Sequence, residues 1–122
     1  MWRNFVGAVL AIMAGSDQAM AAGDPAAGEQ VFKKCAICHS PEKGVNKIGP
    51  SLFGIVGRPS GSIAGFTYSD AMKGAGKTWD EATLNVYLTD PKAFIPGIKM
   101  IFPGLKDETD RANVIAYLAT LK

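Results

Sequence analysis

The stretch Cys35-Ala36-Ile37-Cys38-His39 decides the interpretation of this chain, because two cysteines three residues apart are followed at once by a histidine. On a helix, this spacing places both thiols on one side, where each can form a thioether to one vinyl group of a haem. The histidine is then held beneath the iron as an axial ligand. This pattern is the attachment signature of c-type haem. It predicts one covalent haem c, bound through Cys35 and Cys38, with iron ligated by His39.

The small number of other candidate ligands limits alternative explanations of this motif, since the chain contains only 2 cysteines and 1 histidine. A structural zinc site takes about four Cys or His ligands, which this chain cannot supply. A thioredoxin-like redox pair would lie near a βαβ pattern, and none is visible. A simple disulfide would leave His39 without a role. Covalent haem is therefore the favoured interpretation.

The first 22 residues have the pattern of a secretory signal peptide, which leaves residues 23 to 122 as one mature domain. Arg3 supplies the positive start, an apolar run follows, and Ala19-Met20-Ala21 places small residues where a signal peptidase cleaves. The apolar run is shorter than the roughly 20 residues that span a bilayer. Cleavage and export to the periplasm are expected, and a leader retained as an anchor is the alternative. Export agrees with the motif, because bacteria attach haem c outside the cytoplasm.

The first expected helix carries the haem motif. Asp24 is its N-cap and Pro25 its first residue, and apolar and cysteine positions between residues 31 and 38 recur at helical spacing. This helix is expected to deliver both cysteines and His39 to one side. Residues 40 to 66 are rich in Gly, Pro and Ser, and therefore predict a loop.

A short helix and a longer one are expected next. Residues 68 to 73 favour the short helix, which Gly74 ends. Thr78 and Glu81 have the spacing of a capping box, with the hydroxyl at the N-cap and the carboxylate at N3. The helix that they begin stops before Pro91, since the residue before a proline is biased away from helical geometry.

Residues 92 to 106 predict a second Pro/Gly loop, after which Asp107 caps a last helix. The buried stripe of this helix is expected to be Val114, Ile115, Leu118 and Leu121. The chain is therefore predicted to be all-α, with three main helices, one short helix and long loops wrapped around one covalent haem. Long loops are unusual in a compact domain, and a haem gives them a surface on which to pack.

The second iron ligand is expected to be a methionine, because no histidine other than His39 exists. The mature chain keeps Met72 and Met100. Met100 lies in a loop stiffened by Pro96 and Pro103, which can hold special geometry. Met72 lies on the apolar side of the short helix, where methionine is more often core filler. Met100 is therefore favoured over Met72, and His/Met ligation raises the reduction potential.

Residues 23 to 122 resemble the class I cytochromes c, in the bacterial cytochrome c2 subgroup, because motifs match in order and spacing. The matching elements are Gly28, Phe32, the Cys35–His39 motif, Gly49-Pro50, Gly57-Arg58, Tyr68, Trp79, Tyr87, Pro96-Gly97-Ile98-Lys99-Met100, Val114 and Tyr117. The resemblance implies the cytochrome c fold and assigns Met100 as the second ligand of the haem iron.

The resemblance also implies roles for individual polar residues. The carbonyl of Pro50 accepts the ring proton of His39, which fixes the orientation of the ring. The hydroxyl of Tyr87 points at the ligand sulfur. The donors expected to face a buried haem propionate are Arg58, Tyr68 and Trp79. A buried carboxylate needs such donors.

The predicted function is that of a soluble periplasmic electron carrier, which shuttles single electrons between redox complexes and is not an enzyme. Two alternatives remain open. One is a haem enzyme or gas sensor with an open iron site, against which Met100 and the absence of a second histidine argue. The other is a membrane-tethered haem subunit of a respiratory complex, which a retained leader would favour.

Lysines flank the segments expected to approach the haem edge, and they predict transient docking of a monomer on acidic partners. The lysines are Lys33, Lys34, Lys47, Lys92 and Lys99. The resemblance implies a bc-type complex as electron donor and a terminal oxidase or photosynthetic reaction centre as acceptor. The formal net charge of +2 is too small to indicate nucleic-acid binding.

Overall fold

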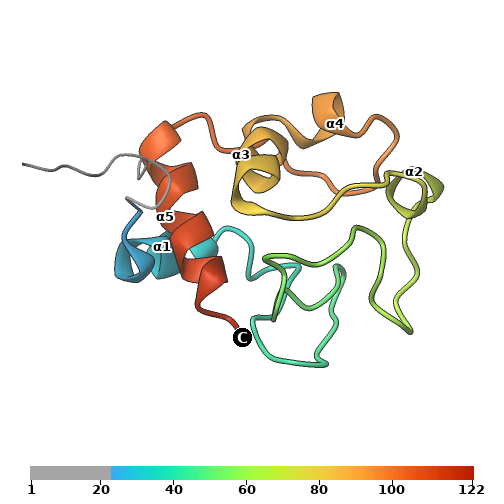
Figure 1. Cartoon of the computed structure of the whole chain (residues 1–122), viewed down its shortest axis with the longest axis horizontal. Helices are drawn as coiled ribbons and strands as arrows, with labels where there is room; N and C mark the ends of the chain where they lie inside the picture. Colours follow the sequence, from blue (N-terminus) through green and yellow to red (C-terminus); the bar gives the residue numbers. More distant parts are fainter. Residues whose placement is uncertain (1–22) are drawn as a thin grey trace, which may run out of the picture.

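The computed structural model describes residues 23–122, and the predicted signal peptide of residues 1–22 lies outside this part. The helices are α1 (Pro25–Phe32), α2 (Asp70–Lys73), α3 (Glu81–Thr89), α4 (Pro91–Phe94) and α5 (Glu108–Ala119) (Figure 1). Within residues 23–122 the only β-type pairing is one isolated bridge between Pro59 and Thr78. The prediction of an all-α fold with long loops is confirmed.

The crossing of α1 and α5 joins the two ends of the described chain (Figure 1). Gly28 makes this crossing close, because a Cβ at this position would collide with the carbonyl oxygen of Asn113 and lie 2.8 Å from Tyr117 Cβ. The rings of Phe32 and Tyr117 pack with centroids 5.2 Å apart. The backbone N–H of Asp24 donates to Asn113 Oδ1 at 2.8 Å, which ties the start of α1 to α5.

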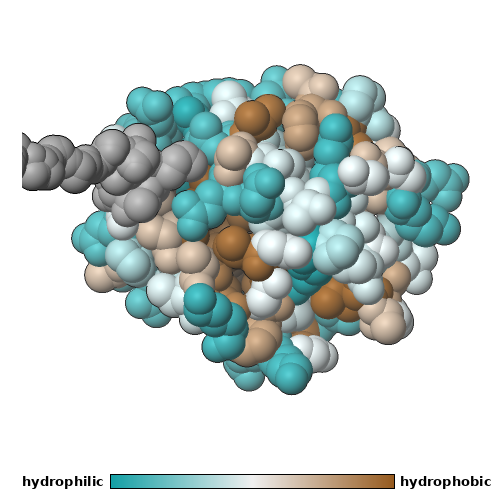
Figure 2. Space-filling model, in the orientation of Figure 1, coloured by the Kyte–Doolittle hydropathy of each residue, from teal (hydrophilic) through white to brown (hydrophobic). Residues whose placement is uncertain are grey.

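The hydrophobic core lies between these two helices, α3 and the surrounding loops. Its buried members are Phe32, Ile55, Trp79, Leu84, Tyr87, Ile95, Ile98, Leu105, Val114, Ile115 and Leu118. Three of the four residues of the stripe expected on the last helix are fully buried, and Leu121 packs against the core beyond the end of α5. One face of the molecule shows hydrophobic residues in small patches between hydrophilic ones (Figure 2).

Helix α1 ends earlier than expected, at Phe32, so the cysteines lie on turns that follow the helix and not on the helix itself. From Lys33 to Cys35 the backbone changes to i→i−3 hydrogen bonds: Lys33 N–H donates to Gln30 O at 3.2 Å, and Lys34 N–H to Val31 O at 3.0 Å. This tightening is common at helix ends. The expectation of one continuous helix through the cysteines was therefore wrong.

The predicted capping box at Thr78 was also wrong, because backbone pairing continues through Trp79 and keeps this next residue out of the helix. Thr78 forms the bridge with Pro59, and Trp79 N–H donates to Arg58 O at 2.9 Å. Helix α3 begins only after these residues. Its N-cap is Asp80, whose carboxylate accepts the Thr83 N–H at 2.7 Å. This hydrogen bond holds the pKa of Asp80 below its ordinary value.

Helix α4 lies in the segment that was expected to be a loop from residue 92 to 106. Asp90 caps it by accepting the Ala93 N–H at 3.3 Å, and Pro91 is its first residue. The same Asp-Pro pair begins α1, where Asp24 accepts the Ala26 N–H at 3.0 Å. The signal for α4 was therefore present in the sequence and was interpreted only as the end of the preceding helix.

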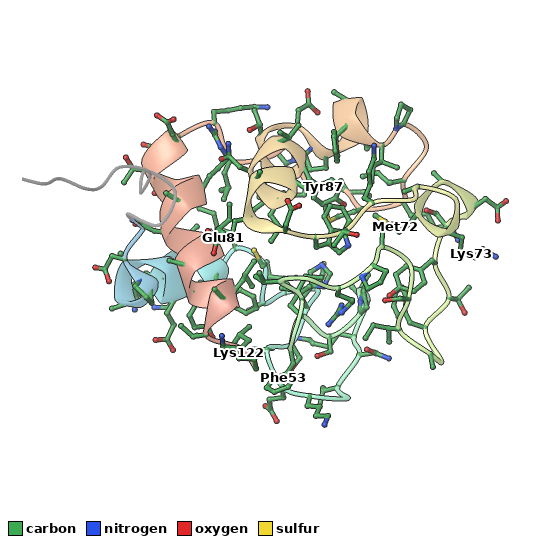
Figure 3. All side chains as sticks on the ribbon, in the orientation of Figure 1. Phe53, Met72, Lys73, Glu81, Tyr87 and Lys122 are labelled. Atoms are coloured by element: carbon green, nitrogen blue, oxygen red, sulfur yellow. The ribbon has the colours of Figure 1, made fainter. Side chains whose placement is uncertain are left out.

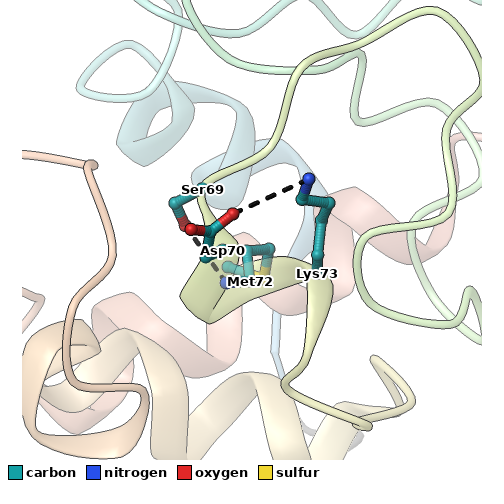
Figure 4. Close-up of polar contacts among 4 residues, drawn as sticks. All are labelled: Ser69, Asp70, Met72 and Lys73. Carbon is teal, nitrogen blue, oxygen red and sulfur yellow. Dashed lines mark hydrogen bonds and ion pairs between the residues drawn. The ribbon is translucent and has the colours of Figure 1, made fainter.

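Helix α2 begins two residues later than expected, because Ser69 is its N-cap. The Ser69 hydroxyl accepts the backbone N–H of Met72 at 3.1 Å (Figure 4). Lys73 and Asp70 form an ion pair of 3.7 Å between exposed side chains, a kind of contact that adds little stability. Gly74 follows as the C-cap, as the sequence predicted.

We expect Gly28→Ala to destabilise the holoprotein by about 1–3 kcal/mol, because the added methyl group would overpack the crossing of α1 and α5. Gly74→Ala is the matched control, since its nearest neighbour would be Asp70 O at 3.5 Å. Denaturant unfolding of both variants measures the difference. Equal midpoints for the two variants would show that the crossing tolerates a side chain.

Candidate haem site

The Cys35–His39 motif occupies the turns directly after α1. The N–H groups of Cys38 and His39 both donate to Cys35 O, at 3.0 Å and 2.9 Å. Both cysteines are partly buried free thiols with no disulfide between them. The Gly49 N–H donates to Cys38 O at 2.7 Å, which pins the following loop to the motif. The two thiols and the imidazole thus come from one short, hydrogen-bonded segment.

The His39 ring has a fixed orientation. Its Nδ1 lies 2.7 Å from Pro50 O, and since a carbonyl can only accept, Nδ1 carries the proton and Nε2 keeps its lone pair. Gly49 leaves room for the ring, because a Cβ there would collide with His39 Cε1. Burial lowers the pKa of His39, and nearby Arg58 and Lys47 act in the same direction. The imidazole is therefore neutral at pH 7 and suited to bind a metal through Nε2.

Polar contacts within residues 40 to 51 hold this arrangement, and the sequence did not reveal them. Ser51, which is 2% exposed, donates its hydroxyl to Glu42 O at 2.6 Å and its N–H to Asn46 Oδ1 at 2.9 Å. The Lys47 ammonium donates to Ala36 O at 2.5 Å, inside the motif. Ser and Asn in a loop are typical of such local bonds, although their partners cannot be read from a sequence.

Met100 lies beside Tyr87, whose hydroxyl donates to Met100 Sδ at 3.9 Å. Burial raises the pKa of Tyr87 to about 12, so the phenol stays protonated and keeps its donor. The Trp79 ring packs on Tyr87 with centroids 4.7 Å apart. Tyr87 reaches in from α3, and Met72 comes from the separate helix α2 (Figure 3). Met72 is partly buried against the core, as filler would be.

The three expected propionate donors lie close together. Arg58 and Trp79 are joined by a backbone hydrogen bond, and the Arg58 guanidinium donates through Nη2 to Phe53 O at 2.5 Å. Burial lowers the pKa of Arg58, and neighbouring Tyr68 opposes this shift. The Tyr68 hydroxyl accepts the Ile63 N–H at 3.0 Å, which leaves its own proton to donate.

Trp79 supplies an independent indication that a polar group belongs in this site. Its side chain is only 6% exposed, and its indole N–H has no hydrogen-bond acceptor among residues 23–122. Buried polar groups are nearly always paired, so an acceptor from outside the chain is expected here. A haem propionate would supply this acceptor, and the two free thiols and the neutral imidazole fit the same cofactor.

The alternative chemistries of the motif find no support. Among residues 23–122, no three His, Cys, Asp or Glu side chains converge into a metal site. Burial raises the pKa of the Cys35 thiol to about 11, and the nearby Lys34 opposes the shift only in part. Redox-active cysteines have the opposite property, a lowered pKa that favours the thiolate. The fold and this donor set define a protein of the c-type haem class.

Comparison with known proteins agrees with this class. Residues 25–122 match the family model of cytochrome c. The chain is 58% identical over 106 residues to a cytochrome c2 of Rhodomicrobium vannielii, covering 86% of this chain and 85% of the relative. It is 52% identical over 99 residues to a cytochrome c of Nigella damascena, covering 80% and 89%.

The solved structure of cytochrome cH from Methylobacterium extorquens has a TM-score of 0.76 and 48% sequence identity, covering 80% of this chain and 99% of that one. The chain therefore belongs to the class I cytochrome c family and is similar to its bacterial cytochrome c2 members. Membership of this family implies a covalently bound haem c and an electron-carrying cytochrome.

The predicted docking lysines are all exposed, but they are not equivalent. Lys33 and Lys34 lie in the turns between α1 and the motif, Lys92 lies in α4, and Lys99 precedes Met100. The ammonium of Lys47 is engaged by Ala36 O and so also has a local structural contact. Among residues 23–122, the three most exposed large apolar side chains are Ile37, Ile48 and Ile101.

Proposed function

We propose that this protein carries single electrons through one haem c, attached to Cys35 and Cys38 and ligated through His39 and Met100. The strongest support is the His39 ring, whose Nδ1 is held by Pro50 O at 2.7 Å, so that Nε2 is free for iron. When bound, the haem supplies a reversible one-electron couple of its iron. The chain itself orients the ligands, excludes water and sets the polarity around them.

Each side of the site has a distinct task. On the imidazole side, Pro50 fixes the tautomer and the ring orientation of His39. On the methionine side, the Tyr87 phenol holds the Met100 sulfur in place through its O–H donor. Both contacts lie in partly or fully buried surroundings, which favours the less charged state of a redox centre and a raised potential. Ligands on both sides leave no open position for a substrate, so an enzyme or gas sensor is the weaker alternative.

Covalent attachment is the first prediction of this proposed function. The motif lies in turns with two unpaired thiols, so haem should stay with the chain after denaturation. Denaturing gel electrophoresis with haem staining checks this on the secreted protein, with Cys35→Ser and Cys38→Ser as variants. Each single variant should keep one thioether, and the double variant should lose the stain. A wild-type band without stain would contradict covalent attachment.

The second prediction concerns the methionine ligand. Met100→Ala should abolish the methionine–iron charge-transfer band at the red edge of the ferric spectrum and lower the reduction potential. Met72→Ala is the matched control, because Met72 packs on the core from α2 and should leave the band in place. Visible spectroscopy and potentiometry of both holoproteins decide. The reverse result would assign the ligand to Met72.

We further propose that the protein works as a monomeric carrier in the periplasm, after removal of the leader at residues 1–22. Within residues 23–122, no helix is long and apolar enough to cross a membrane. Its partners are proposed to be a bc-type complex as donor and a terminal oxidase or photosynthetic reaction centre as acceptor. Binding to these complexes must be brief, because a carrier has to leave after each transfer.

The residues around the site suit brief docking. Ile37 lies inside the motif and Ile101 follows Met100, and they are 74% and 90% exposed. Lys92 and Ile101 line one surface cavity of about 300 Å³ together with Asp90, so charged and apolar groups meet there. Lysines steer the approach of an acidic partner, whereas small apolar contacts exclude water without holding the complex long.

The third prediction tests this steering. Lys34→Glu and Lys99→Glu should each slow electron transfer to an anionic partner protein at low salt, and the slowing should shrink as ionic strength rises. Lys122→Glu makes the same charge change at the chain end and should have a smaller effect. Stopped-flow rates across a salt series provide the measurement. A decrease in rate that does not depend on ionic strength would mean that these lysines act on the haem site or the fold.

A further inference from the structure

The segment after Met100 is fastened to the end of α3. Residues 101 to 106 have no secondary structure of their own, yet Leu105 is 4% exposed and its N–H donates to Leu88 O at 2.7 Å. Gly104 lies so close to α3 that a Cβ would collide with Thr89 O, and its φ of 104° favours glycine. The returning leg of the methionine loop is therefore anchored at one place.

Lys106 makes the first of two side-chain contacts at this anchor. Its ammonium donates to Thr89 O at 2.7 Å and to Pro103 O at 3.1 Å. Thr89 is the last residue of α3, where carbonyl groups lack helical partners and the helix dipole favours a cation. Lys106 thus satisfies the end of α3 and holds the loop to it with the same group.

Arg111 makes the second contact, from α5. Its Nη1 donates to Leu105 O at 2.8 Å, and its Nε donates to Asn85 Oδ1 at 2.8 Å. Leu105 is thereby bonded on both of its backbone groups, through its N–H to α3 and through its carbonyl to α5. A single guanidinium joins the loop, α3 and α5.

Both cations bind uncharged acceptors. In the part of the chain that the structure describes, the one ion pair is that between Lys73 and Asp70. Lys106 and Arg111 instead bond to backbone carbonyls and to the Asn85 amide. Such contacts depend on hydrogen-bond geometry more than on long-range charge, so they should respond weakly to added salt.

The helix that receives this anchor also carries Tyr87, the neighbour of the Met100 sulfur. The anchor carbonyls of Leu88 and Thr89 directly follow Tyr87 along α3. We propose that Lys106 and Arg111 are positioning residues for Met100: they fix the returning leg of its loop to α3 and so hold the sulfur at the Tyr87 hydroxyl. This role rests on the proposed ligation by Met100.

The experiment measures how easily the methionine is displaced in the ferric holoprotein. Free imidazole competes for the position of Met100, so its affinity reports opening of the loop. Lys106→Met and Arg111→Lys should each bind imidazole about 5- to 10-fold more tightly, as loss of hydrogen bonds from a charged group predicts. Lys106→Arg keeps a donor and should stay near the wild type. The increase in imidazole affinity of Lys106→Met and Arg111→Lys should be the same at low and high salt.

Two further measurements separate positioning from general destabilisation. Lys43→Met is the matched control, because Lys43 is exposed and makes no polar contact within residues 23–122, and its imidazole affinity should not change. Hydrogen exchange of the Leu105 amide, which donates to Leu88 O, should accelerate by a similar factor in Lys106→Met. Denaturant unfolding of the same variants should show a smaller change in the free energy of global unfolding than the change in the free energy of loop opening that imidazole binding reports.

Three results would overturn the positioning role. One is an imidazole affinity in Lys106→Met and Arg111→Lys equal to that of Lys43→Met, with the methionine band intact in all proteins. Another is a change that follows global stability alone and leaves Leu105 exchange unaffected. The third is a wild-type protein without the methionine band, which removes the proposed ligation as well and is thus recognised before any variant is compared.

Discussion

The hydrogen bond from His39 Nδ1 to Pro50 O is the constraint on which the site depends. It decides which ring nitrogen is free, and it needs the loop of residues 40 to 51 to return to the motif. Gly49 permits that return, because its missing side chain leaves space for the imidazole. The buried Ser51 then joins the two ends of this loop, because its hydroxyl donates to Glu42 O. Loop residues that would make no contact with the iron thus hold the ring in the orientation that the proposed ligation needs.

The sequence predicted the family and its covalent haem better than it predicted local structure. The motif at Cys35 to His39 has few alternative meanings, so one cofactor followed from it. Helix boundaries failed where tertiary contacts outweigh local preference. Thr78 has the features of a good N-cap, but backbone pairing of Trp79 with Gly57 and Arg58 keeps the residue after it out of the helix, and Asp80 caps α3 instead. Such pairing joins residues distant in sequence, and no local sequence pattern predicts it.

Helix α4 was missed for a different reason. Asp90 and Pro91 were interpreted as a stop for the preceding helix, although an Asp-Pro pair also starts one, as it does at Asp24. Both interpretations are correct, since Asp90 ends α3 and caps α4. The contacts of Lys106 and Arg111 were invisible for a further reason: a lysine or arginine that bonds a backbone carbonyl looks, in a sequence, like any other surface charge.

The two sides of the site are held by different kinds of contact, and this bears on which side yields first. The His39 ring is secured directly, by the hydrogen bond between its own Nδ1 and Pro50 O, 11 residues along the chain. The Met100 sulfur receives one long contact from the Tyr87 hydroxyl, at 3.9 Å, and its loop is secured farther along the chain, through Leu105 and the cations that bind around it. Local bonds reform quickly after a fluctuation, whereas a loop anchored at its far end opens as a unit. Under the proposed ligation, Met100 is therefore the ligand that a local opening of its loop would release, and the anchor formed by Lys106 and Arg111 would set how often the loop opens.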